Sequence, residues 1–223
     1  MKLPKVIVFD VGGTLVKNLN LNYDKAFAYL KLIFKADESF IDRCNEFKKL
    51  KIDTRDITGK ETSFKELVSY LSNYYELNEK CDSLFVEENF RKSLYETLPI
   101  DGSNKCLEYL HEKGVKLYCF SNSIFSSEEI KLELEQYDLA KYFETIISSA
   151  DFGYRKPNKK VFEKYIKLSE KNSIWFIGND VQCDILPALD FPCRPILLSN
   201  KTWRHPEYTE INSYDDFIKL VEE

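Results

Sequence analysis

The sequence lacks the features by which membrane, secreted, zinc-binding and nucleic-acid-binding proteins are recognised. No apolar run approaches the roughly 18 residues of a membrane span. The N-terminal apolar run is short and ends in an acid, which does not fit a signal peptide. No two cysteines form a C-x-x-C pair, which argues against a zinc site. The Lys and Arg residues are scattered and the net charge is −5, so we expect no nucleic-acid partner and no membrane partner.

What remains is the composition of an ordinary globular protein. Apolar residues make up 43% of the chain and charged residues 31%, which is typical of a soluble domain. The 223 residues suffice for one large domain or for a domain with a smaller insert. The six cysteines show no pairing pattern, and Cys119 lies in an apolar strand pattern that suits a reduced thiol. We therefore expect a cytoplasmic protein that is a monomer or a homodimer.

The first functional signal lies within residues 5–16. Residues 6–9 are four consecutive apolar side chains, which is typical of a buried parallel strand. Asp10 follows at the carboxyl end of this strand, where open α/β sheets bind ligands. Gly12 and Gly13 come next, and without a Cβ atom they let backbone N–H groups approach an anion. A strand followed by an ordinary turn, with Asp10 as a cap, would give the same local pattern.

Residues 23–94 form the longest stretch of helical pattern. They contain no proline, and Gly59 is their one glycine. Apolar residues recur there at helical spacing in four successive stripes. Ser63 and Glu66 form a capping box before the third stripe. We therefore predict an all-helical block of about four helices, inserted straight after the first strand.

Apolar runs then alternate with helical patterns to the end of the chain. This alternation indicates an α/β fold with a doubly wound, Rossmann-like parallel sheet. The predicted strands cover residues 115–120, 143–147, 174–177 and 194–198, and the main helices cover residues 103–113, 126–140, 184–189 and 214–221. The expected domains are a Rossmann-like core over residues 1–16 and 97–223 and a helical cap over residues 17–96.

Polar residues follow three of the predicted strands, and a loop adds a lysine. Because the carboxyl ends of parallel strands lie along one edge of a sheet, we expect these side chains to gather there. Carboxylate and amide oxygens are hard ligands that suit Mg²⁺. A hydroxyl group and a lysine can hold phosphoryl oxygens, and a carboxylate can attack phosphorus in line. The residues concerned are Asp10, Ser121, Asn122, Lys156, Asn179, Asp180 and Asp184.

Four motifs resemble, in order and separation, those of the haloacid dehalogenase-like (HAD) hydrolase superfamily. They are Asp10-Val11-Gly12-Gly13-Thr14-Leu15, Ser121-Asn122, Gly153-Tyr154-Arg155-Lys156-Pro157 with Phe162, and Gly178-Asn179-Asp180 to Asp184. Each motif is weak alone, but together they are specific and span nearly the whole chain. The resemblance implies a Rossmann-like core with a helical cap of the C1 type. It also implies a Mg²⁺-dependent hydrolase, most simply a phosphatase of a small phosphorylated metabolite.

The resemblance further implies a role for each site residue. Asp10 is the expected nucleophile, and Lys156 and Ser121 are the expected catalytic residues that bind the phosphate. Gly12, Gly13 and Asn122 complete the expected phosphate-binding set. Mg²⁺ is expected on Asp10, on the backbone carbonyl of Gly12 and on the fourth motif, through Asn179, Asp180 and Asp184.

The sequence departs from the family pattern at two positions. Phosphatases of the family carry a second Asp two residues after the nucleophile, as acid for the leaving group and base for water, and Gly12 stands there instead. Losing such a group typically costs about 10²–10⁴-fold in rate. Asn179 stands where the family usually has an Asp that binds Mg²⁺, so the site loses a charge. Asp180 can compensate, since its spacing to Asp184 also occurs in the family.

These departures leave four functions open, of which we favour the first. It is a phosphatase of substrates with good leaving groups, such as acyl or aryl phosphates, or a phosphatase in which a group of the substrate or of the cap protonates the leaving group. The second is a 2-haloacid dehalogenase, although that branch carries a bulky aromatic residue at the Gly12 position. The third is a phosphonoacetaldehyde hydrolase with Lys51 as its cap lysine. The fourth is a weak or inactive binder of a phosphorylated ligand. His205 is a further candidate to line the site.

Overall fold

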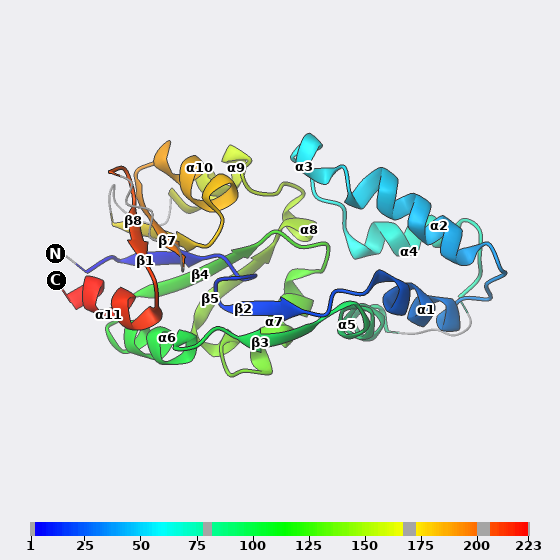
Figure 1. Ribbon diagram of the computed structural model, residues 1–223, viewed down its shortest axis with the longest axis horizontal. Coiled ribbons are helices and arrows are strands. Elements are labelled where there is room, and N and C mark those ends of the chain that lie inside the picture. The colour runs from blue at the N-terminus through cyan, green and yellow to red at the C-terminus, as the bar shows by residue number, and fades with distance from the viewer. Residues whose placement is uncertain (1–2, 78–81, 167–172, 200–205, 223) are drawn as a thin grey trace.

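The structure is a computed structural model that describes residues 3–77, 82–166, 173–199 and 206–222. Figure 1 shows an elongated molecule, with a β-sheet and its covering helices at one end and a group of helices at the other. Among the helices of these ranges, none is long and apolar enough to cross a membrane.

The main sheet has six parallel strands in the order β5-β4-β1-β6-β7-β8. Their bounds are β1 Val6–Phe9, β4 Lys116–Ser121, β5 Phe143–Ser148, β6 Ile174–Gly178, β7 Cys193–Leu198 and β8 Thr209–Ile211. Phe9 of the central strand is level with Cys119 of β4 and with Ile177 of β6. The residues that follow these three strands therefore meet at one edge. The predicted doubly wound α/β fold is confirmed, and the short edge strand β8 is an addition to it.

Strand β1 is apolar throughout because both faces of the sheet are covered. Side chains alternate between the two faces of a strand. Ile7 and Phe9 belong to the larger core cluster, with side chains of the helices α6 (Ser103–Glu112), α7 (Ser127–Glu135) and α11 (Tyr214–Glu222). Val6 and Val8 belong to the smaller cluster, with side chains of α9 (Lys159–Ile166) and α10 (Leu186–Leu189). The continuous run of residues 6–9 is therefore the pattern that a central parallel strand requires.

The core helices follow the prediction with local differences. Ser126 caps α7 by accepting a hydrogen bond from the Glu129 N–H, as the capping box predicts. This helix ends at Glu135, earlier than predicted, because the chain turns through Asp138 at φ +58°. The predicted helix at 184–189 is a π-helical turn, η3, continued by α10. The bounds are α6 Ser103–Glu112, α7 Ser127–Glu135, η2 Ala140–Tyr142, α8 Ser149–Phe152, α9 Lys159–Ile166, η3 Val181–Ile185, α10 Leu186–Leu189 and α11 Tyr214–Glu222.

The inserted helices pack through the apolar stripes that predicted them. Phe27, Phe40, Leu67 and Phe90 come one from each stripe, and all four are buried. Ser63 caps its helix by accepting a hydrogen bond from the Glu66 N–H. The bounds are α1 Tyr23–Ile33, α2 Phe40–Phe47, η1 Lys48–Ile52, α3 Arg55–Thr58, α4 Phe64–Ser72 and α5 Ser83–Leu94. The α3 turn ends at Gly59, whose φ of +64° favours glycine.

A two-stranded antiparallel ribbon joins the helices to the core, and it was not predicted. Strand β2, Val16–Leu19, pairs with β3, Glu96–Pro99, so that Val16 faces Pro99 and Leu19 faces Glu96. The helices are therefore not inserted straight after the first strand, because this ribbon intervenes (Figure 1). The expected domain boundaries at 16/17 and 96/97 fall at opposite ends of the ribbon.

Candidate active site

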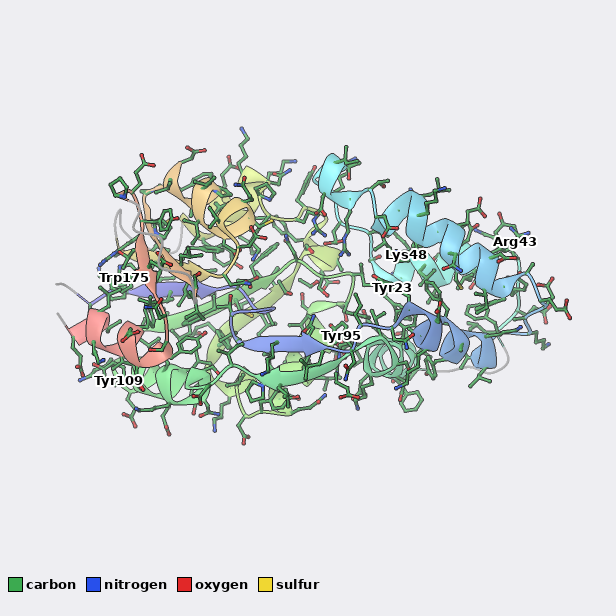
Figure 2. All side chains as sticks on the ribbon, viewed as in Figure 1. Tyr23, Arg43, Lys48, Tyr95, Tyr109 and Trp175 are labelled. Carbon is green, nitrogen blue, oxygen red and sulfur yellow. The ribbon has the colours of Figure 1, made fainter. Side chains whose placement is uncertain are left out.

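A cleft of about 400 Å³ lies between the carboxyl edge of the sheet and the inserted helices. The ends of β1, β4 and β6 contribute to it from the core, and Arg55 of α3 contributes from the helices. Tyr23 and Tyr95, at the two passages of the chain between helices and core, line it as well (Figure 2). The predicted site residues among its lining are Asp10, Gly12, Ser121, Asn122, Lys156, Asn179, Asp180 and Asp184.

Lys156 is the centre of the polar network in this cleft. Its ammonium Nζ lies 2.5 Å from Asp10 Oδ1 and 2.6 Å from Asp184 Oδ1. All three side chains are buried. The other oxygen of Asp10, Oδ2, accepts a 2.9 Å hydrogen bond from the Thr14 hydroxyl. The sheet edge therefore brings together a carboxylate, a lysine and a second carboxylate from three separate motifs.

The electrostatics of these groups follow from their burial and mutual distance. Burial acts to lower the pKa of Lys156, but the charges of Asp10 and Asp184 outweigh it and hold that pKa above its ordinary value. The ammonium is therefore charged at neutral pH. Burial raises the pKa of Asp184 to about 6, against the opposing effect of Lys156. A paired cation deep in a cleft is suited to hold an anionic group of a substrate.

The loop after β1 uses its two glycines in different ways. Gly12 is exposed to the cleft, and a Cβ atom there would meet no atom within 4 Å. Gly13 has φ +80°, its N–H donates to the Val16 carbonyl, and its face lies against Asn179. The expectation that the Gly13 N–H binds an anion is not supported, because this N–H already has a partner. Tyr214 of α11 holds the loop by donating a 2.7 Å hydrogen bond to the Thr14 carbonyl.

The second motif supports the loop that carries Lys156. Ser121 ends β4, is buried and lines the cleft. Asn122 Nδ2 donates to the Lys156 carbonyl at 2.9 Å, and Asn122 Oδ1 accepts from the Lys156 N–H at 2.8 Å. Both polar atoms of the Asn122 side chain are thus bonded to the backbone of the lysine. The geometry gives this side chain a positioning role, where the sequence predicted phosphate binding.

The two aspartates of the fourth motif have different roles. Asp180 is exposed, and its Oδ1 accepts hydrogen bonds from the N–H groups of Gln182 and Cys183, so it caps the η3 turn. Asp184 is buried one turn later, and it is the acid that reaches Lys156. Its approach needs Gly178, since a Cβ atom at that position would lie 2.3 Å from Asp184 Oδ2.

The donor set at the sheet edge fits Mg²⁺. Among the residues that the structure describes, no three His, Cys, Asp or Glu side chains form a cluster. Mg²⁺ is usually held by only one or two carboxylates, with water and substrate phosphate as further ligands. Asp10 and Asp184 supply two carboxylates that share one ammonium. Asn179 Oδ1 lies 3.4 Å from the Thr14 hydroxyl that also bonds Asp10, which adds a neutral oxygen to the set.

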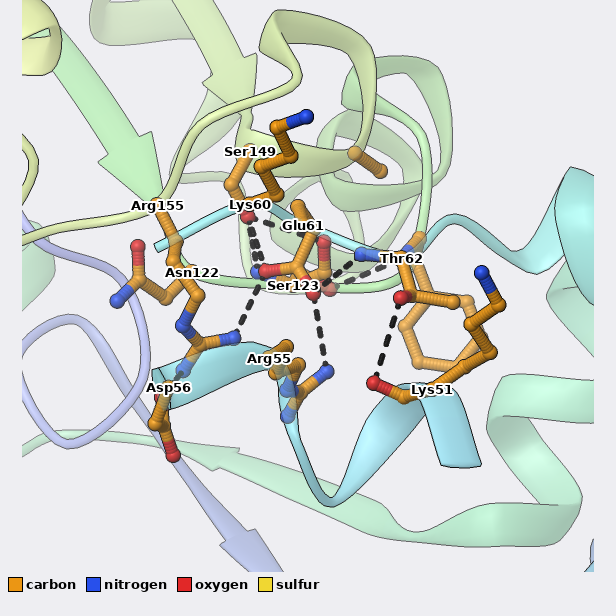
Figure 3. Close-up of polar contacts among 12 residues, drawn as sticks. Lys51, Arg55, Asp56, Lys60, Glu61, Thr62, Asn122, Ser123, Ser149 and Arg155 are labelled. Carbon is orange, nitrogen blue, oxygen red and sulfur yellow. Dashed lines mark hydrogen bonds and ion pairs between the residues drawn. The ribbon is translucent and has the colours of Figure 1, made fainter. Parts of the chain in front are cut away.

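Sequence reasoning missed several residues around the cleft. Thr14 belongs to the first motif, and the hydrogen bond from its hydroxyl to Asp10 could have been predicted from their i, i+4 spacing within a tight loop. Arg155 lies beside Lys156 and bonds Glu61 of the inserted segment, which no motif indicates (Figure 3). Lys51 is exposed and does not line the cleft, so the structure gives no support to a cap lysine at Asp10. His205 lies outside the described residues.

The sequence matches the family of haloacid dehalogenase-like hydrolases over residues 4–191. A search of curated protein sequences finds no match. Three solved structures illustrate the similarity of fold. A predicted phosphoglycolate phosphatase from Haemophilus somnus is 17% identical with a TM-score of 0.63, and 99% of each chain is covered. The HAD-hydrolase YfnB from Bacillus subtilis, bound to magnesium, is 18% identical with a TM-score of 0.60, and 100% of each chain is covered.

The third structure, a dehalogenase, is 16% identical with a TM-score of 0.59, covering 97% of this chain and 96% of that one. At such identities these structures show the fold alone. The family match extends over most of the chain and includes all four motifs. The chain therefore belongs to the haloacid dehalogenase-like hydrolases.

Proposed function

We propose that this hydrolase is a Mg²⁺-dependent phosphatase of a small phosphorylated metabolite, with Asp10 as its nucleophile. The observation that carries the proposal is the contact of 2.5 Å between Lys156 Nζ and Asp10 Oδ1 inside the cleft. An ammonium group beside a carboxylate draws the negative charge of a phosphoryl group to the place where the carboxylate can attack. A cleft of about 400 Å³ limits the substrate to a small molecule.

The reaction has two steps. First, a carboxylate oxygen of Asp10 forms a bond to phosphorus while the bond from phosphorus to the leaving oxygen breaks. Water then attacks the phosphorus of the aspartyl phosphate, which releases phosphate and restores Asp10. The Lys156 ammonium and the Ser121 hydroxyl hold the non-bridging oxygens in both steps. Thr14 fixes the orientation of the Asp10 carboxylate through its bond to Oδ2.

Asp10, Asp184, Asn179 and the Gly12 carbonyl are the groups that would hold Mg²⁺. When bound, the ion neutralises charge on the phosphoryl group. Asn179 contributes no charge, so we expect weaker metal binding than with an acid at this position. Asp180 is the remaining acid of the motif, and one of its carboxylate oxygens accepts the two hydrogen bonds that cap η3.

Gly12 determines which substrates turn over quickly. No side chain at this position can give a proton to the leaving group or take one from water. Substrates whose leaving groups need little protonation, such as acyl and aryl phosphates, are therefore expected to react best. Alkyl phosphates such as sugar phosphates are expected to react poorly.

Phosphate release from a panel of substrates tests the proposal. The panel contains acetyl phosphate, p-nitrophenyl phosphate, sugar phosphates and nucleotides, each assayed with Mg²⁺, with EDTA and with Asp10→Asn. Turnover of the good leaving groups that requires both Mg²⁺ and Asp10 supports a phosphatase. No turnover by either the parent or Gly12→Asp would favour a non-catalytic binder. Halide release from a 2-haloacid would favour a dehalogenase instead.

We also place the protein in the cytoplasm, as a monomer or a homodimer. The described cysteines are all free thiols, which suits a reducing compartment. Burial raises the pKa of the Cys44 thiol to about 12, so this group stays protonated and unreactive.

A further inference from the structure

A buried carboxylate joins the inserted helices to the core on the side of the cleft away from the ribbon. Glu61 lies just after α3, and its side chain is fully buried. Its Oε1 accepts from Arg55 Nη1 at 3.2 Å and from the Thr62 N–H at 3.0 Å. Its Oε2 accepts from Ser149 Oγ at 2.6 Å and from Arg155 Nη1 at 2.9 Å. Figure 3 shows these groups converging on Glu61 from both parts of the molecule.

Such a group is costly to bury unless its partners are well placed. An isolated buried charge is strongly unfavourable, and a buried ion pair often contributes little net stability. Glu61 satisfies both oxygens with four donors, two of which belong to the core. Asp56 adds a 2.7 Å ion pair to Arg155 Nη2 from the exposed side. The arrangement therefore specifies one relative position of the segment and the core.

The backbone makes the same junction. Lys60 and Tyr154 form an isolated antiparallel bridge. The Glu61 N–H donates to the Gly153 carbonyl at 3.3 Å, and the Arg155 N–H donates to the Gly59 carbonyl at 3.2 Å. The inserted segment thus pairs with the Gly153–Lys156 loop through a short antiparallel, strand-like contact.

This loop is the one that delivers the lysine of the site. Arg155 immediately precedes Lys156, whose N–H is held by Asn122 and whose Nζ contacts Asp10. A shift of the Arg155 backbone therefore displaces Lys156. The ribbon is the covalent connection of the helices to the core. The Glu61 junction is a further contact between them, beside the ion pairs that Arg91 of α5 makes with Glu129 and Glu133 of α7, and it is the contact that reaches the loop of Lys156.

We propose that Glu61 is a positioning residue that latches the cap onto the Gly153–Lys156 loop and thereby sets Lys156 against Asp10. When the latch is made, the cleft is closed and the lysine is in place. When it is broken, the loop loosens and Lys156 moves away from Asp10. The catalytic consequence rests on the proposed phosphatase reaction, whereas the coupling between Glu61 and the Lys156 backbone does not.

The test is amide hydrogen exchange of the full-length protein, read at Glu61, Arg155 and Lys156. Glu61→Gln keeps the size of the side chain but removes its charge. We expect exchange at all three amides to quicken at least tenfold, with the amides of α4 unchanged within twofold. Asp56→Asn alters only the exposed partner of Arg155, so it should give the same pattern more weakly without endangering folding. Glu88→Gln, which breaks an exposed ion pair with Lys92 in α5, is the matched control and should change none of these amides.

Three results would overturn the proposal. Unchanged exchange at Lys156 would show that the junction does not position the lysine. An equal quickening throughout α4 would make Glu61 a stability element only, and no change at any amide would mean that no latch exists. In turnover of acetyl phosphate, Glu61→Gln should lower kcat at least tenfold and change KM less than kcat. A parent protein without turnover would refute the phosphatase and leave the exchange result to decide the latch.

Discussion

Gly12→Asp is the substitution that examines the proposed chemistry most closely. It places a carboxyl group two residues after Asp10, where Gly12 offers neither a proton donor nor a base. The structure has room for it, since a Cβ atom at Gly12 meets nothing within 4 Å and the position is exposed to the cleft. The free energy of unfolding should change by about 0.5 kcal/mol or less, as for other exposed substitutions.

The expected gain follows from general acid–base catalysis, which contributes about 10²–10⁴-fold in rate. This corresponds to about 3–5 kcal/mol of the activation free energy. Asp10 and Asp184 would raise the pKa of the new carboxyl group by charge repulsion, a direction that suits a proton donor. The gain should be largest for sugar phosphates, whose leaving groups need a proton, and smallest for acetyl phosphate.

The assay compares kcat/KM of the parent and Gly12→Asp across leaving groups of different pKa. The parent should show a steep decline with rising leaving-group pKa, and the variant a shallow one. Gly13→Ala is the control, because its Cβ would lie 2.4 Å from Asn179 Nδ2 and its φ is +80°. It should lower the melting temperature without any gain in rate. A well-folded Gly12→Asp with the parent's rates and the parent's steep dependence would refute the reasoning.

Three further predictions concern two neighbours of the site, Gly178 and Thr14, and one buried acid of α7, Glu129. Gly178→Ala puts a Cβ atom 2.3 Å from Asp184 Oδ2 and should displace that carboxylate. Mg²⁺ affinity, measured by calorimetry, should then fall about 10–100-fold. Unchanged affinity would contradict the proposed ligand role of Asp184. Thr14→Val removes the hydrogen bond to the Asp10 carboxylate, and a hydrogen bond to a charged group contributes about 1.5–3 kcal/mol. The kcat for p-nitrophenyl phosphate should therefore fall roughly 10- to 150-fold. A fall below threefold would mean that Thr14 does not orient Asp10. Burial raises the pKa of Glu129 to about 8. Between pH 4.5 and 8 this carboxyl group therefore keeps its proton in the folded state, whereas the unfolded chain has lost it. The contribution of Glu129 to the free energy of unfolding falls as the pH rises through that window. Melting temperatures of Glu129→Gln should therefore decline less than those of the parent between pH 5 and 8, and equal declines would show that Glu129 does not titrate there.

The parts of the fold that the sequence predicted are those with one dominant physical cause. Residues 6–9 had to be a central strand because both of their faces are apolar, and the structure buries both. The inserted helices were predicted because each stripe packs an apolar residue into a common core. The ribbon of β2 and β3 was missed because each strand has only four residues, half of the residues in the ribbon as a whole are polar, and cross-strand pairing defines the strands.

The site was predictable to the level of motifs but not of individual hydrogen bonds. The topology of a parallel sheet brings Asp10, Lys156 and Asp184 to one edge, as expected. The partners of Gly13, Asn122 and Asp180 depend on local turn geometry, which the sequence does not reveal. Glu61 and Arg155 are far apart in the chain and belong to no common motif, so only the structure brings them together.

The central claim is that Asp10 attacks phosphorus, and covalent labelling tests it most directly. The protein is mixed with ³²P-labelled acetyl phosphate and Mg²⁺, quenched in acid and mapped by mass spectrometry. The account predicts a hydroxylamine-sensitive phosphoryl group on Asp10, none on Asp10→Asn, and a shorter lifetime in Gly12→Asp, because the added base speeds hydrolysis. Labelling of another residue, or equal labelling of Asp10→Asn, would contradict it.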